Sequence, residues 1–323
     1  MSSGAKIWQV ARFFLALVAV LLVGEVAARG LTGAEHEPLR WYDEVAELKI
    51  AQIEERGEAQ VVVAGTSMAW QSLVPSELVE SAGFESAYNA GLNGGVPGVM
   101  APWLLDHVEP QLQPEVVIWG LGSLDFAPQY GAPNIEQFAE AAETRSGWLA
   151  DVERWVSDRS VLIRRRSTIR SLSAVAGSDR EDLADRRSDA DQSLAPDGER
   201  IGESVELPLR LEAIQRARLA GFEIDQDDVE VVRATVRALQ ERGVEVVLVE
   251  MPVPQRFVDL HPGGQESVRQ VRATIESLAA ELNVTAIVGV GGFEEADFLD
   301  FTHLDAAGSR WFSDVVADQL TLD

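Results

Sequence analysis

The sequence predicts an α/β fold, in which a parallel sheet carries helices on both faces. Short runs rich in β-branched apolar residues recur along the 323-residue chain, as expected of strands that are buried on both faces. Longer segments in which apolar residues recur with helical spacing separate these runs. Strands that alternate with helices form βαβ units, and such units build a parallel sheet that is covered on both sides.

Five strands and five helices make up this alternation. The expected strands span residues 60–65, 86–91, 115–120, 244–251 and 284–290. The expected helices lie around residues 98–108, 136–157, 227–242, 265–282 and 305–320. The prediction is therefore a three-layer, flavodoxin-like domain with a five-stranded parallel sheet, spanning residues 59–323.

The alternation breaks at about 158–225. Residues 159–172 are strongly basic, and residues 174–208 are rich in Ser, Asp, Gly, Arg and Glu. We expect a helical or disordered insertion here, because the second stretch has too few apolar residues for a core of its own. The basic stretch suits either anionic headgroups and acidic polymers or a surface helix balanced by nearby carboxylates, and the surface helix is favoured.

The N-terminal 31 residues predict a membrane anchor or a signal peptide. Lys6 and Arg12 precede the uncharged stretch 13–24, and Arg29 follows it. An uncleaved single-pass anchor is favoured over a cleaved signal ending near Val26-Ala27-Ala28. The excess of positive charge before the apolar stretch predicts a cytoplasmic N-terminus and an extracytoplasmic domain. Residues 32–58 then read as a stalk and an amphipathic helix.

Composition and motifs exclude several classes of function. The chain has 53 acidic and 27 basic side chains, a net charge of −26, which argues against nucleic acid as a partner. There is no cysteine, so disulfides and thiolate chemistry are excluded. The turn at 64–70 (AGTSMAW) lacks the form of a phosphate loop, and no His, Asp or Glu cluster has metal-binding spacing. No metal or nucleotide cofactor is expected, and a nucleotide-binding flavodoxin-like protein is disfavoured.

Three residues at predicted strand ends form a candidate catalytic set. In open parallel sheets the site lies at the carboxyl ends of the strands. Ser67 follows the first strand and opens a helix, which suits a nucleophile. Asp300 and His303 lie three residues apart after the last strand, so they can supply a base and the carboxylate that orients it.

Further candidates lie in the loops after the second and third strands. Gly91, Asn93 and Gly94 belong to a loop whose glycines allow backbone N–H groups to approach a bound carbonyl. Ser123 and Asp125 follow the third strand, and Asp125 is expected to hold the loop by accepting backbone N–H groups.

The other three histidines carry weaker expectations. His261 follows the fourth strand and either contacts substrate or is structural, and the structural role is favoured. His36 and His107 have no functional residues around them in the sequence and receive no role.

These blocks resemble the SGNH (GDSL-like) hydrolase and acyltransferase superfamily over about 61–126 and 243–320. The resemblance implies a Ser67 nucleophile in GTSM, a second-block glycine at Gly94, and the D-x-x-H of Asp300 and His303. The third block departs from the family's G-x-N-D, because Leu124 stands where the family has an oxyanion-binding Asn. Such a donor is typically worth about 10²–10³ in rate.

The arrangement also resembles a narrower set, the membrane-anchored proteins of alginate O-acetylation and the DltD-like proteins of D-alanylation. That resemblance implies a serine esterase or O-acyltransferase acting on acyl esters of a cell-envelope or exported glycan. It further implies a membrane-bound O-acyltransferase as partner. The alternative is a non-catalytic protein that keeps this scaffold to bind carbohydrate or to assemble a polysaccharide-modification complex.

Overall fold

The structure is a computed structural model that describes residues 43–131, 134–135, 138, 193–201 and 209–320. The chain divides into two compact units, and every element described below belongs to the unit formed by Arg40–Ala141 and Asp191–Asp323. The predicted anchor at 1–31 lies outside the described residues, as does nearly all of the predicted helix at 136–157. Among the helices that are described, none is long and apolar enough to span a bilayer.

Five parallel strands form the sheet, in the order β2-β1-β3-β6-β7. Their bounds are β1 Val61–Gly65, β2 Ala87–Asn89, β3 Val116–Leu121, β6 Glu245–Glu250 and β7 Thr285–Ile287. In register, Val61 lies beside Ala87 on one side and Val116 on the other. The predicted parallel five-stranded α/β sheet is confirmed, although β2 and β7 are shorter than expected. In this order of strands, ligands bind at the carboxyl ends of β1 and β3, where the connections that leave the two strands lead to opposite faces of the sheet.

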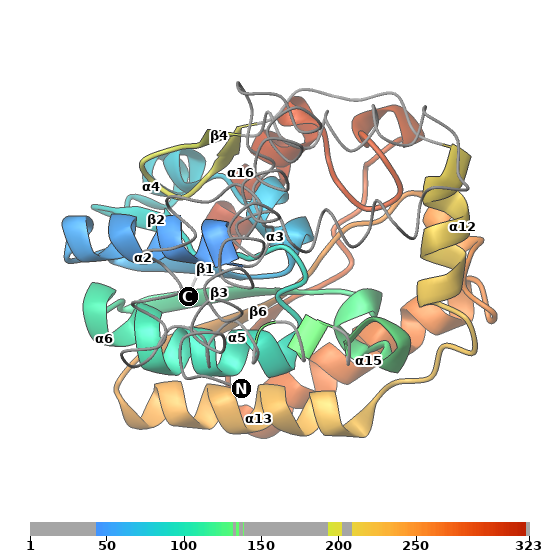
Figure 1. Ribbon diagram of the computed structural model, residues 1–323, viewed down its shortest axis with the longest axis horizontal. Helices are drawn as coiled ribbons and strands as arrows, with labels where there is room; N and C mark the ends of the chain where they lie inside the picture. Colours follow the sequence, from blue (N-terminus) through green and yellow to red (C-terminus); the bar gives the residue numbers. More distant parts are fainter. Residues whose placement is uncertain (1–42, 132–133, 136–137, 139–192, 202–208, 321–323) are drawn as a thin grey trace, which may run out of the picture. The chain divides into compact units, whose positions relative to one another are not determined.

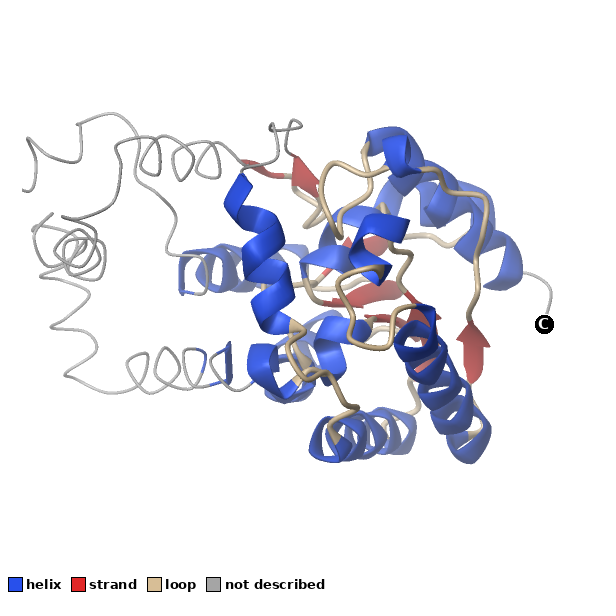
Figure 2. Ribbon diagram, turned by 90° about the vertical axis from the view of Figure 1, so that its right-hand side faces the viewer, coloured by secondary structure: helices blue, strands red, loops and turns tan. Residues whose placement is uncertain are grey.

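Helices cover both faces of the sheet (Figures 1 and 2). One face carries α3 Ser67–Ser72, α4 Pro75–Ala82 and α16 Ala306–Leu320. The opposite face carries α5 Pro97–Trp103, continued by the π-helix η1 Leu104–Val108 and α6 Glu109–Leu112, together with α13 Gln226–Glu241 and α15 Gln265–Leu282. The predicted helices at 227–242, 265–282 and 305–320 agree with α13, α15 and α16 to within a residue.

Burial on both faces explains why the strands read as continuous apolar runs. Every residue of β1 and of β3 is buried. On the α3–α4–α16 side, Val61 and Val63 pack in one cluster with Met68, Phe312 and Val316. Each such side chain contributes about 1.5–3 kcal/mol when it is removed from water, which makes this packing the main stabilising term.

The remaining elements flank the sheet. They are α2 Asp43–Arg56, the 3-10 turn η2 Ser123–Phe126, the hairpin β4 Ser193–Leu194 and β5 Arg200–Ile201, α12 Leu209–Arg218, α14 Gln255–Val258 and the 3-10 turn η4 Glu295–Asp297. The hairpin and α12 fall within the predicted insertion. Lys49 of α2 is fully buried and donates to the carbonyl oxygens of Asn89 and Gly198, so it joins α2, β2 and the hairpin.

Candidate active site

Ser67 lies at the carboxyl end of β1, as the first residue of α3. The preceding Gly65 has a φ of +135°, which side-chain-bearing residues rarely adopt. A Cβ atom there would lie 2.5 Å from the carbonyl oxygen of Gly120 on β3. Glycine therefore lets β1 and β3 run close together up to the turn, and the turn then places the Ser67 hydroxyl at the edge of the sheet.

Asp300 and His303 come from the loop between η4 and α16. The loop closes on itself, because Phe298 and Leu304 form an antiparallel bridge and Leu299 N–H donates to the His303 carbonyl at 2.8 Å. Asp300 Oδ1 accepts the backbone N–H groups of Thr302 at 2.7 Å and His303 at 2.9 Å. One carboxylate oxygen thus shapes the turn and leaves the other oxygen for the imidazole.

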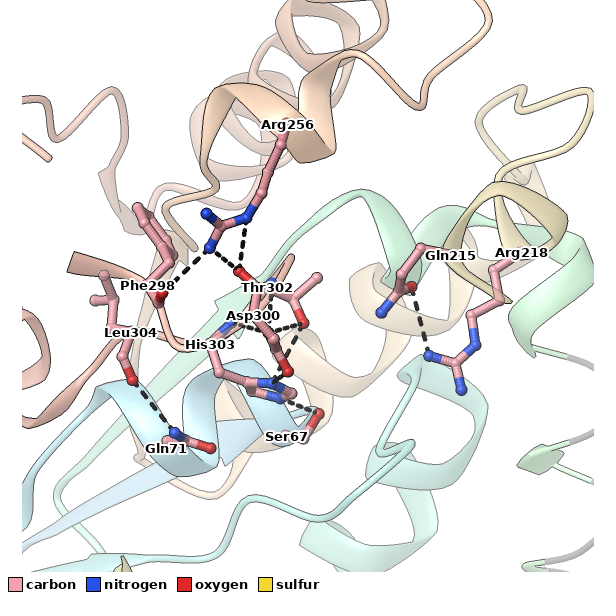
Figure 3. A network of polar contacts seen from close by, with 10 residues as sticks. All are labelled: Ser67, Gln71, Gln215, Arg218, Arg256, Phe298, Asp300, Thr302, His303 and Leu304. Carbon is pink, nitrogen blue, oxygen red and sulfur yellow. Dashed lines mark hydrogen bonds and ion pairs between the residues drawn. The ribbon is translucent and has the colours of Figure 1, made fainter. Parts of the chain in front are cut away.

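A hydrogen-bonded chain joins the three side chains (Figure 3). His303 Nε2 lies 2.9 Å from Ser67 Oγ, and His303 Nδ1 lies 2.7 Å from Asp300 Oδ2. An ionised carboxylate can only accept, so the Nδ1 atom must carry the hydrogen. The Nε2 atom is then left with a lone pair that faces the serine hydroxyl. The structure therefore brings together the three residues of the predicted catalytic set, although Ser67 and His303 are 236 positions apart in the chain.

Asp300 is held in its ionised form. Burial by itself would raise the pKa of this carboxyl group, but the charge and hydrogen bond of His303 and the two backbone N–H groups outweigh burial. The net result is a pKa well below the usual range for Asp. Across the neutral pH range the imidazole accordingly has a permanent negative charge 2.7 Å from its Nδ1 atom.

Asn89, which is not among the residues predicted for the site, holds α3, the helix that begins at Ser67, in place. It is fully buried at the end of β2, and its Nδ2 atom donates to the carbonyl oxygens of Ala69, Trp70 and Leu73 at 3.3, 3.0 and 2.8 Å. Its Oδ1 atom accepts Gly91 N–H at 3.0 Å. The sequence signal that could have pointed to Asn89 was its position as a polar residue at the end of an otherwise apolar strand.

The loop after β2 lies against the end of β1. Leu92 N–H donates to the Gly65 carbonyl at 3.0 Å, and a Cβ atom on Gly91 would lie 2.9–3.0 Å from atoms of Trp70. Gly94 has a φ of +65°. Neither the backbone N–H of Gly94 nor the side chain of Asn93 forms a hydrogen bond with another described residue. The loop thus lies beside the nucleophile turn and carries two groups, the Gly94 N–H and the Asn93 amide, that can still donate hydrogen bonds.

The third loop offers no side-chain donor at position 124. Ser123, Leu124 and Asp125 are all buried in the turn η2, and Leu124 is apolar. Asp125 Oδ2 accepts the N–H of Gly122 at 2.8 Å, which closes the turn. Burial raises the pKa of Asp125 well above its usual range, and the Gly122 N–H offsets only part of this. Asp125 therefore holds this turn through Gly122, and Leu124 supplies no polar side chain to the loop.

His261 packs in the core of the domain. It is buried, meets the rings of Phe222 and Phe257 edge-on, and its Nδ1 atom lies 3.2 Å from the Phe257 carbonyl. Burial lowers its pKa, so it is held neutral. These contacts agree with the structural role favoured for this histidine. Over the residues that the structure describes, no group of three or more His, Cys, Asp or Glu side chains could hold a metal ion.

Comparisons with known proteins return distant structural similarity alone. No protein-family model matches the sequence, and no curated protein matches it. Solved structures similar to this chain include a protein of Desulfitobacterium hafniense DCB-2 assigned to the lipolytic G-D-S-L family (12% identity, 80% of this chain and 98% of that chain, TM-score 0.41). A GDSL-like lipase of Bacteroides thetaiotaomicron VPI-5482 has 11% identity, with 86% of this chain and 98% of that chain covered and a TM-score of 0.38.

The inhibitor-bound form of the M. smegmatis aryl esterase is a further similar structure, with 13% identity, 81% of this chain and 98% of that chain covered, and a TM-score of 0.39. At these identities and TM-scores the similarity assigns neither a family nor an activity to the chain.

Proposed function

We propose that this protein is an SGNH-type serine hydrolase or O-acyltransferase that acts on acyl esters. The observation that carries the proposal is the unbroken hydrogen-bonded chain from Ser67 Oγ through His303 to Asp300, with distances of 2.9 and 2.7 Å. Its three members sit at the carboxyl edge of a parallel sheet, where sites of this architecture lie. The resemblance of the motif blocks around them to the SGNH superfamily adds support.

In the proposed reaction, Ser67 Oγ attacks the ester carbonyl carbon while its proton passes to His303 Nε2. Asp300 holds the imidazole through Nδ1 and stabilises the positive charge that forms on it. The backbone N–H groups of Ser67 and Gly94 are the proposed donors to the oxyanion. The tetrahedral intermediate collapses, the alcohol leaves with the proton from His303, and the acyl group stays on Ser67 Oγ. Water or a sugar hydroxyl then takes the acyl group by the reverse sequence.

Covalent labelling tests the nucleophile directly. The wild-type protein is expected to react with a fluorophosphonate probe, and Ser67→Ala to lose all labelling. Ser72→Ala is the matched control, because Ser72 is also buried on α3 and lies outside the hydrogen-bonded chain. A wild-type protein that neither labels nor hydrolyses an activated acetyl ester would refute the catalytic proposal.

For the substrate and location, we propose an acyl ester of a cell-envelope or exported glycan, met by a domain tethered outside the cytoplasmic membrane. The basic and apolar pattern of residues 1–31 supports this location. The resemblance to the proteins of alginate O-acetylation and D-alanylation supports a membrane-bound O-acyltransferase as partner. Alkaline phosphatase fused after Asp323 is expected to be active, and a fluorescent protein that matures only in the cytoplasm to stay dark at the same position. The opposite pattern would place the domain inside the cell and would exclude a cell-envelope or exported glycan as substrate.

The alternative is a non-catalytic protein that keeps the scaffold to bind carbohydrate or to assemble a modification complex. Leu124 in place of a polar donor motivates it. A serine hydroxyl remote from the imidazole would favour this alternative, whereas the 2.9 Å contact between Ser67 and His303 favours catalysis. Ester hydrolysis by the purified protein, lost in Ser67→Ala, would exclude the alternative.

A further inference from the structure

Arg256 lies next to the loop that carries the catalytic acid and base. It belongs to α14 Gln255–Val258, which follows β6, and its guanidinium group reaches across to residues 295–300. Figure 3 shows the guanidinium directly above the backbone of Asp300 and Phe298. No motif in the sequence singles this residue out.

The hydrogen bonds of Arg256 converge on that loop. Its Nη2 atom donates to the carbonyl oxygens of Asp300 at 2.5 Å and Phe298 at 3.1 Å, and its Nε atom also reaches the Asp300 carbonyl at 3.2 Å. Its Nη1 atom donates to the Glu295 carbonyl at 3.3 Å and pairs with the Glu295 carboxylate at 2.8 Å. The planar fork thus binds three backbone carbonyls of one turn, a geometry that an ammonium group cannot reproduce.

The position of these carbonyls determines where Asp300 and His303 lie relative to Ser67. The Asp300 carbonyl belongs to the same residue as the carboxylate that holds His303, and Phe298 forms the bridge that closes the loop. A loop segment can shift by an ångström without unfolding, and a displacement of about 1 Å can cost about 10²-fold in rate. Hydrogen bonds to a charged donor are stronger than neutral ones, so the guanidinium is well suited to prevent such a shift.

We propose that Arg256 is a positioning residue that holds the Asp300–His303 loop in register with Ser67 and contributes to turnover without contacting substrate. The inference rests on the proposed function. It predicts that Arg256→Ala lowers kcat by about 10- to 100-fold with KM almost unchanged, because binding surfaces stay intact while the base is misaligned. The kcat of Arg256→Lys is expected to lie between those of the wild type and Arg256→Ala. Guanidinium ions at millimolar concentration are expected to restore part of the activity of Arg256→Ala.

The matched control is Arg233→Ala. Arg233 is similarly accessible, with 22% of its side chain exposed against 28% for Arg256, and it also binds several oxygens, here on the carboxylates of Glu230 and Glu281. It joins α13 to α15, outside the catalytic loop. Loss of this arginine is expected to lower thermal stability by as much as the loss of Arg256 while leaving kcat within about twofold of wild type.

A second readout needs no substrate. The His303 Nδ1 proton, bonded to Asp300, is expected to give a low-field proton resonance in the wild type, identified by its loss in His303→Ala, and to weaken or vanish in Arg256→Ala. Unchanged kcat together with an unchanged resonance would overturn the inference while the proposed function stands. If the wild type is inactive, the proposed function fails and the resonance alone decides the role of Arg256. If Arg256→Ala does not fold, Arg256→Lys is judged by both measurements.

Discussion

Replacing the carboxylate of Asp300 by an amide is expected to invert the hydrogen bonding of His303. In Asp300→Asn the side-chain oxygen must stay where Oδ1 is, because the backbone N–H groups of Thr302 and His303 both donate to that atom. The amide NH2 group then faces His303 Nδ1. Two donors cannot share a hydrogen bond, so Nδ1 becomes the acceptor and the hydrogen moves to Nε2. The imidazole can no longer take the proton of Ser67.

The size of the effect follows from the lost charge. A carboxylate and an imidazolium whose charges lie about 4 Å apart attract each other by about 4 kcal/mol at an effective dielectric constant of about 20. That attraction exists only after His303 has become protonated, so it lowers the barrier without tightening the ground state. Its loss corresponds to about 10³-fold in kcat. Reversal of the tautomer adds to this, so a fall of 10³- to 10⁴-fold is expected.

Steady-state hydrolysis of p-nitrophenyl acetate at pH 7–8 measures this change, with the rate of fluorophosphonate labelling as a second assay. Asp297→Asn is the matched control: Asp297 is a carboxylate in the same segment that accepts the N–H of Glu294 at 2.7 Å and does not touch His303. It is expected to retain kcat within about threefold. An Asp300→Asn protein that keeps more than a tenth of wild-type kcat would refute both the predicted reversal of the tautomer and the predicted size of the electrostatic effect.

Three further substitutions probe the electrostatics and packing of the domain. Burial raises the pKa of Asp228 to about 7, with Asp225 and Asp227 adding to the effect, so the folded state keeps a proton that the unfolded chain loses near pH 4. Stability therefore falls as pH rises from about 4 to 7, and Asp228→Asn should raise the free energy of unfolding by about 1–3 kcal/mol at pH 8 but little at pH 4.5, as measured by urea titration. Equal effects at both pH values would contradict this. Lys49→Ala should lower that free energy by about 3 kcal/mol, because it removes the donor from two buried carbonyls; a loss under 1 kcal/mol would argue against this role. Gly65→Ala should leave little folded protein in circular dichroism, since its Cβ would overlap a backbone oxygen 2.5 Å away.

Much of the fold could be predicted because the burial of an element shows in the local pattern of apolar residues. Residues 61–65 and 116–121 are buried on both faces, so they read as continuous apolar runs, and α15 at 265–282 shows a regular apolar stripe. The carboxyl end of a strand is a topological position that the chain itself reveals. For that reason Ser67, Asp300 and His303 could be named as a set from their residue types together with their positions at predicted strand ends.

Tertiary structure decided how those residues meet and what holds them. The distance between Ser67 and His303 depends on how β1 and the last loop come together across 236 positions, which no local pattern encodes. Arg256 looks ordinary in the sequence, and Asn89 shows there only as a polar residue at the end of a strand. An amide or a guanidinium gains its role from the backbone carbonyls that folding brings within reach. The carbonyls of α3 and of residues 295–300 converge on these two side chains only in the folded chain. The sequence by itself thus determined which residues could react, while the packing of distant backbone segments determined their alignment.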